Sequence, residues 1–71
     1  MWTTVGTQKL DGGEAAASVE PFRRAIALVE TYAPAHYQLG RALQRLGRVS
    51  EARAAFARAH ALNPALIAPE F

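Results

Sequence analysis

Apolar residues recur with helical spacing most clearly in the second half of the chain. The stripe consists of Leu39, Leu43 and Leu46, with Ala35 and His36 beside it. Intervals of four and three residues place these side chains on one face of a helix. Pro34 suits the first turn, where its missing N–H costs nothing. Gly47 suits the left-handed residue that follows a helix end, so the pattern predicts an amphipathic helix between the two.

A second apolar face follows after a short turn. Ser50 is the predicted N-cap of this helix, and Asn63 and Pro64 end it. The inward-facing side chains are Ala52, Ala55, Phe56, Ala59 and Leu62. Two helices joined by so short a turn form a helical hairpin.

The first half has a weaker pattern of the same kind. Helical spacing links Val5 to Lys9, and the Asp-Gly-Gly run at 11–13 then interrupts the chain. A clearer helix follows, with Val19, Phe22, Ala25, Ile26 and Val29 on one side. Pro21 is tolerated only in a first turn, so Ser18 is the predicted N-cap. No segment alternates as a strand does, and the predicted fold class is all-α with four helices.

The two halves of the chain repeat each other. A shift of 34 residues superimposes Trp2, Val5, Gly6, Gly13, Phe22, Ala25 and Leu28 on His36, Leu39, Gly40, Gly47, Phe56, Ala59 and Leu62, in that order. We expect Gly40 and Ala52 to be small because the two helices approach closely there. Phe56 is then expected to fill the gap between the helices.

This period and these residues resemble the tetratricopeptide repeat. The second unit carries the pattern as His36-x-x-Leu39-Gly40-x-x-Leu43, then Ala52-x-x-x-Phe56, Ala59 and Pro64, with His36 in place of the usual Trp. The first unit opens well with Trp2-x-x-Val5-Gly6 but departs at Lys9, Ser18 and Glu30. The resemblance implies an α-α superhelix. It divides a single domain, 1–71, into repeat 1 (2–32), repeat 2 (33–66) and a short tail (67–71).

The length of the chain bears on its partners. The 71 residues include no cysteine, so one domain without disulfides is expected. Stacked repeats normally need about three units to bury a continuous core. The apolar end, with Leu66, Ile67 and Phe71 in the tail, should therefore continue into further units or dock on another chain.

Catalytic and metal-binding patterns are missing from the sequence. Ser18 and Ser50 are explained as helix caps, and neither lies in a G-x-S-x-G motif. The glycines near the N-terminus lack the G-K-[ST] ending of a phosphate loop. His36 and His60 have no ligand-type residue three or four positions away. We therefore expect no enzyme activity, no metal and no cofactor, with packing or partial exposure as the role of the histidines.

The charge of the chain is small but uneven. The net charge is +2, and five arginines against one acid, Glu51, lie between Tyr37 and Ala61. Tyr37, Arg41, Gln44 and Arg48 recur at spacings of four, three and four, opposite the leucine stripe. Such a line of groups suits a carboxylate-bearing peptide. A solvated helix face is the alternative interpretation.

The resemblance also implies which residues would form a binding groove. The first helix of each tetratricopeptide unit typically lines the concave face, which here would present Thr3, Thr7, Tyr37, Arg41, Gln44 and Arg45. The predicted function is a protein-interaction module that binds a peptide or helix, with acidic groups or a C-terminal carboxylate. The alternative is an assembly element whose uncapped end docks on itself or on a larger complex.

Other partner classes are not indicated. The basic residues form no consecutive block and lack interleaved aromatic residues, so no nucleic-acid partner is expected. No apolar run approaches a membrane span, and no signal peptide is visible. A cytoplasmic location is the default expectation.

Overall fold

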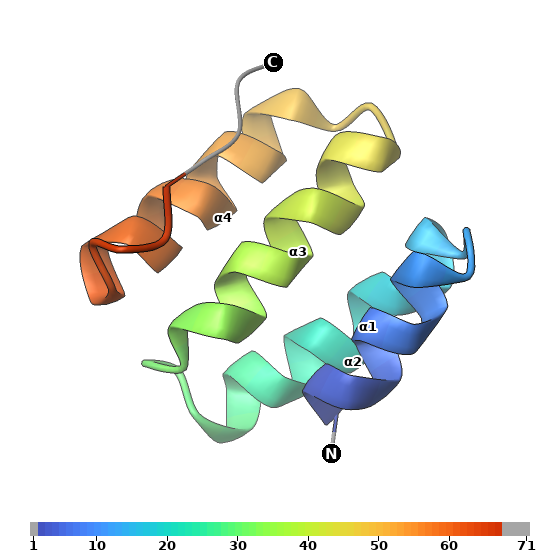
Figure 1. Ribbon diagram of the computed structural model, residues 1–71, viewed down its shortest axis with the longest axis horizontal. Coiled ribbons are helices and arrows are strands. Elements are labelled where there is room, and N and C mark those ends of the chain that lie inside the picture. The colour runs from blue at the N-terminus through green and yellow to red at the C-terminus, as the bar shows by residue number, and fades with distance from the viewer. Residues whose placement is uncertain (1, 68–71) are drawn as a thin grey trace.

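The protein consists of two helical hairpins side by side (Figure 1). The computed structural model describes residues 2–67. Helices α1 (Trp2–Asp11) and α2 (Ala15–Leu28) form the first hairpin, and α3 (Ala33–Arg45) and α4 (Val49–Leu62) form the second. No strand occurs within residues 2–67, and the predicted all-α fold is confirmed.

The two hairpins turn in the same way. Gly13 and Gly47 have positive φ angles of 84° and 79°, a region in which a Cβ atom is strained. After α3, the N–H of Gly47 donates to the carbonyl of Gln44 and that of Arg48 donates to the carbonyl of Leu43. After α1, Gly13 and Glu14 donate in the same pattern to Leu10 and Lys9. Both helices therefore end in a Schellman motif, which satisfies their last carbonyl groups.

In each hairpin, a glycine of the first helix packs directly against a phenylalanine ring of the second. A Cβ atom at Gly40 would lie 2.9 Å from Cδ1 of Phe56, and one at Gly6 would lie 2.7 Å from Cε1 of Phe22. Phe22 and Phe56 are almost completely buried, as is Ala52. The expected small residues at 40 and 52, and the large one at 56, are thus where close packing needs them.

Helix α2 begins earlier than the sequence predicted. Its first residue is Ala15, so Ser18 is not an N-cap and Pro21 lies inside the helix. The Oγ atom of buried Ser18 donates a hydrogen bond of 2.6 Å to the carbonyl oxygen of Ala15. Three consecutive alanines favour the helix strongly enough to extend it ahead of the proline, whose missing N–H removes only one intrahelical bond.

The predicted cap of α4 is also wrong. Helix α4 begins at Val49, Arg48 occupies the N-cap position, and no side chain makes a cap hydrogen bond. Ser50 is the second helical residue and is exposed. The hydrogen-bonded turn through Arg48 leads directly into the helix, which leaves no extended residue at position 50 for a cap.

Helix α1 also contributes a core residue that the sequence pattern missed. Leu10 is fully buried against Phe22 and Ala42, while neighbouring Lys9 pairs with Glu14 at 3.8 Å. The repeat register placed Lys9, not Leu10, at the inward position. A helix with few apolar residues can rotate about its axis so that the neighbouring position faces the core. Here the burial of Leu10 decides which position faces inward.

Helix α3 is the centre of the molecule. It packs against α4, α2 and α1, whereas no Cα atoms of α2 and α4 lie within 8 Å of each other. One core cluster joins Leu43, Ala52, Ala55 and Phe56, and the other joins Leu10, Phe22 and Ala42. Leu39 and Val19 pack against both clusters, so a single apolar layer runs through the two hairpins.

Candidate peptide-binding face

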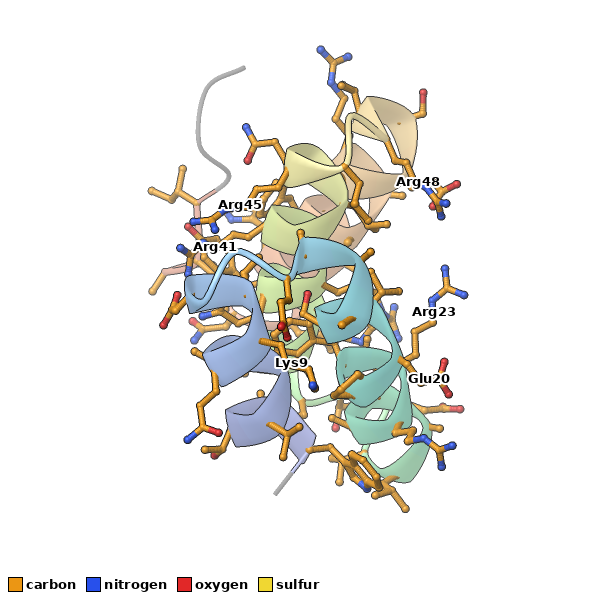
Figure 2. All side chains as sticks on the ribbon, turned by 90° about the vertical axis from the view of Figure 1, so that its right-hand side faces the viewer. Lys9, Glu20, Arg23, Arg41, Arg45 and Arg48 are labelled. Carbon is orange, nitrogen blue, oxygen red and sulfur yellow. The ribbon has the colours of Figure 1, made fainter. Side chains whose placement is uncertain are left out.

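Helices α1 and α3 carry the candidate residues of the predicted groove. Thr3 and Thr7 lie on α1, and Tyr37, Arg41, Gln44 and Arg45 lie on α3. All six are partly buried except Arg45, which is exposed. Figure 2 shows Arg41 and Arg45 together on the side of the molecule where α1 lies. The fold therefore brings these two arginines to one face.

Arg45 links the two hairpins. Its Nη1 atom donates a hydrogen bond of 2.9 Å to the carbonyl oxygen of Leu10, across 35 residues of sequence. That carbonyl also accepts from the N–H of Gly13 in the turn after α1, and its second lone pair is free for the guanidinium, which the negative end of the helix dipole attracts. The bond fixes the guanidinium beside α1, and it leaves the other N–H groups of Arg45 available to a ligand.

Arg41 is also held by a neutral group. Its Nη1 atom donates to Oε1 of Gln38 at 2.9 Å. Within residues 2–67, the ion pairs are Lys9–Glu14, Arg24–Glu20 and Arg48–Glu51. Neither Arg41 nor Arg45 is in an ion pair among these residues, so neither guanidinium is neutralised by a direct carboxylate contact there.

The ring of Tyr37 packs partly against the core. Its ring lies edge-on to the ring of Phe56, with centroids 5.3 Å apart and an interplanar angle of 63°. Such edge-to-face pairs stabilise the fold beyond their buried area. The packing sets the orientation of the Tyr37 ring, which remains partly accessible.

Arg48 does not belong to the predicted stripe. Helix α3 ends at Arg45, and Arg48 precedes α4, where it pairs with Glu51 at 3.9 Å. In Figure 2, Arg48 points to the opposite side from Arg41 and Arg45. The predicted stripe assumed that the helix continued to Arg48. The chain turns at Gly47, so the stripe ends at Gln44.

The two histidines make backbone contacts. Nε2 of His36 donates to the carbonyl oxygen of Glu30 at 2.8 Å, which ties α3 to the preceding loop. Nδ1 of His60 lies 3.3 Å from the carbonyl oxygen of Leu66. In the part of the chain that the structure describes, no three His, Cys, Asp or Glu residues gather as metal ligands would. None of the helices described is long and apolar enough to cross a membrane.

An apolar surface lies at the open end of the first hairpin. A hollow of about 340 Å³ is lined by Trp2, Thr3, Thr4, Ala25, Leu28, Val29 and Tyr32. Leu28 is 72% exposed and Val29 is 52% exposed, while the guanidinium of Arg24 lies 5.1 Å from the centroid of the Trp2 ring. The sequence pattern placed Val29 on the inward side of its helix. It lies outside because α2 ends at Leu28.

The tail carries a smaller exposed apolar group. Leu66 is partly buried, and Ile67 is 72% exposed. Phe71, the third residue expected in this apolar end, lies outside the described residues. Within residues 2–67, the larger exposed apolar surface therefore belongs to the first hairpin.

Paired hairpins with a repeated glycine–phenylalanine contact and a repeated glycine turn define an α-helical repeat protein. The tetratricopeptide repeat model matches residues 33–66. The second hairpin thus matches a tetratricopeptide repeat, which is consistent with assignment of the chain to that family. No match was found among curated proteins or among solved structures. Tetratricopeptide repeats generally mediate protein–protein interactions and are typically non-catalytic.

Proposed function

We propose that this protein is a non-catalytic interaction module that binds an acidic peptide or helix on the face formed by α1 and α3. The observation that carries the proposal is the pair Arg41 and Arg45, which lie on one side of the molecule and are held by neutral acceptors. Carboxylates bind such positioned guanidinium groups through short, charge-assisted hydrogen bonds. A C-terminal carboxylate or an Asp or Glu side chain supplies the same chemistry.

The other candidate residues complement these charges. Phe56 holds the ring of Tyr37 in place, and part of that ring is accessible. A partner side chain can therefore pack on the ring without the entropy cost of immobilising Tyr37. The hydroxyl groups of Thr3 and Thr7 and the amide of Gln44 are hydrogen-bonding groups for a peptide backbone. We propose the whole chain, 1–71, as the single domain that presents this face.

A titration with matched peptides tests the proposal. A peptide rich in Glu and a peptide with Lys at the same positions are added to ¹⁵N-labelled protein. The acidic peptide should shift the amide signals of α1 and α3, and Arg41→Glu should weaken its binding. Arg53→Glu makes the same charge change at an exposed position of α4, outside both α1 and α3, and serves as the control. An equal loss in both variants, or signals that move elsewhere, contradicts the proposed site.

The exposed apolar end favours a second candidate function, assembly with itself or with a larger complex. Leu28, Val29 and Tyr32 leave a hollow that burial against another chain would remove from water. Sedimentation velocity over a range of concentrations tests self-association. A concentration-dependent dimer that Leu28→Asp abolishes supports this function through the first hairpin, whereas dependence on Ile67→Asp points to the tail. A monomer unchanged by either variant excludes self-assembly.

A further inference from the structure

A cleft of about 560 Å³ lies between α2 and α4. It exists because the backbones of these two helices lie apart, on either side of α3. Leu39 and Leu43 of α3 form its floor, Ile26 lines the α2 wall, and Ala54 and Ala55 line the α4 wall. The alanine side chains of the α4 wall are short, so partly buried Leu39 can be reached from the cleft, whereas Leu43 is almost fully buried beneath it.

The cleft is on the opposite side of the molecule from the proposed peptide-binding face. In Figure 2, Arg23 of the α2 wall projects on the side away from Arg41 and Arg45. The groups that line the cleft belong to α2, α3 and α4 and include none of the six candidate residues described above. A ligand in the cleft would therefore use different side chains from a peptide bound on α1 and α3.

The rim of the cleft carries excess positive charge. Arg23 on one wall and Arg58 on the other are both exposed. Neither forms an ion pair with any residue in the range 2–67, whereas the rim acid Glu51 pairs with Arg48. An apolar floor between two unpaired guanidinium groups is complementary to a ligand with an apolar centre and acidic edges.

The walls also restrict the backbone of the ligand. All three sides of the cleft are helices, whose mid-helix N–H and C=O groups are hydrogen-bonded within the helix. An extended peptide would find no sheet edge to pair with and would lose water from its own backbone groups. A helix satisfies those groups internally and presents apolar side chains along one face.

We propose that this cleft binds an amphipathic helix of a partner protein, with acidic residues flanking its apolar face. The apolar side chains of that helix contact Ile26, Leu39 and Ala54, and its carboxylates approach Arg23 and Arg58. This site does not depend on the α1–α3 face. One partner can therefore occupy either surface, or two partners can bind together.

A designed helix tests the cleft directly. The probe is a synthetic peptide of about 18 residues, about 27 Å long as a helix, which matches the 27 Å longest dimension of the protein. It carries Leu with helical spacing on one face and Glu on the flanks. A second peptide has Lys in place of each Glu. Fluorescence anisotropy gives the affinities, and amide shifts of ¹⁵N-labelled protein locate the site.

The acidic peptide should bind and shift the amides of Ile26, Leu39 and Ala55, while the basic peptide should not. The double variant Arg23→Glu, Arg58→Glu should weaken binding about tenfold or more, because both rim charges are reversed. Arg53→Glu, at an exposed position of α4 that does not line the cleft, is the control and should leave this affinity unchanged. Failure of the acidic peptide to shift these amides at millimolar concentration overturns the proposal.

A pair of substitutions on α4 separates the cleft from general effects on the helix. Ala54 and Ala57 are both exposed, but only Ala54 lines the cleft. Ala54→Phe should fill the cleft and abolish binding, whereas Ala57→Phe should not. Equal affinities in the two variants contradict the cleft as the site. If Ala54→Phe instead dissociates a dimer of the protein, a second copy occupies the cleft and the proposed partner helix is wrong.

Discussion

Gly40 lies so close to the ring of Phe56 that a Cβ atom at position 40 would be 2.9 Å from both Cδ1 and Cε1. Real Cβ atoms essentially never come within 3.0 Å of another group, so the ring can lie between α3 and α4 only because the residue is glycine. Gly6 and Phe22 repeat this relationship 34 residues earlier. The two hairpins therefore share this contact as well as the glycine turn.

Gly40→Ala should therefore destabilise the protein. The added methyl group forces the buried Phe56 ring to move, and overpacking of this kind costs about 1–3 kcal/mol. Alanine recovers up to about 1 kcal/mol through its better helix propensity, so the net effect should be a loss. Urea unfolding followed by circular dichroism measures it. A midpoint equal to that of the wild type would show that the ring is not tightly held.

Ser50→Ala should leave stability unchanged or raise it. Ser50 lies within the first turn of α4, is exposed and caps no backbone group. Alanine favours the helix by up to about 0.7 kcal/mol, whereas removal of a true N-cap would cost about 1 kcal/mol. The sign of the change in unfolding free energy therefore decides between the two roles.

Ser18→Ala is expected to stabilise the first hairpin by a few tenths of a kcal/mol. The hydroxyl group is buried, and it donates to Ala15 of its own helix. Alanine needs no such partner, and Ala52 occupies the equivalent buried position in the second hairpin. Ser18→Val is the comparison, because its larger side chain should destabilise the same site. Thermal unfolding of the three proteins gives the order.

Substitutions at Gly13 and Gly47 should destabilise the protein through backbone strain. Gly13→Ala and Gly47→Ala should each cost about 1–2 kcal/mol, because φ is positive at both positions. No atom lies within 4 Å of a Cβ built at either glycine, so the cost comes from backbone strain alone. Asn tolerates this conformation better. The Asn variants should therefore unfold at higher temperature than the Ala variants, and the reverse order would contradict backbone strain as the cause.

Binding of an acidic peptide to the α1–α3 face should weaken as salt is added. Arg45 is exposed and Arg41 is partly so, and the Debye length falls from about 10 Å at 0.1 M to about 3 Å at 1 M salt. Affinity should therefore drop several-fold over this range. An affinity independent of salt would mean that apolar contacts, such as those of Tyr37, dominate.

The features of the fold that sequence could predict are those set by one residue type. Gly13 and Gly47 mark the turns because only glycine adopts a positive φ at little cost. Gly40 and Phe56 mark a close helix contact because their sizes are complementary. The shift of 34 residues then transfers both features to the first hairpin, where the helical pattern itself is weak.

The sequence predictions were wrong at positions where more than one residue satisfies the same local rule for a cap or an inward-facing side chain. A serine near a helix start suits an N-cap, yet Ser18 and Ser50 both lie inside helices. Lys9 held the inward position in the repeat register, but packing selected Leu10. The cleft between α2 and α4 depends on the angle between the hairpins, and no single helix pattern contains that information.

The central position of α3 also bears on how the chain folds. All close backbone approaches between the hairpins, with Cα atoms within 8 Å, involve this helix, and each hairpin pairs helices that are adjacent in sequence. Such short-range topologies fold in microseconds to milliseconds because little chain entropy is lost before contacts form. Either hairpin can then act as the nucleus. The amides of α3 should exchange with solvent most slowly, since they open only when both hairpins separate.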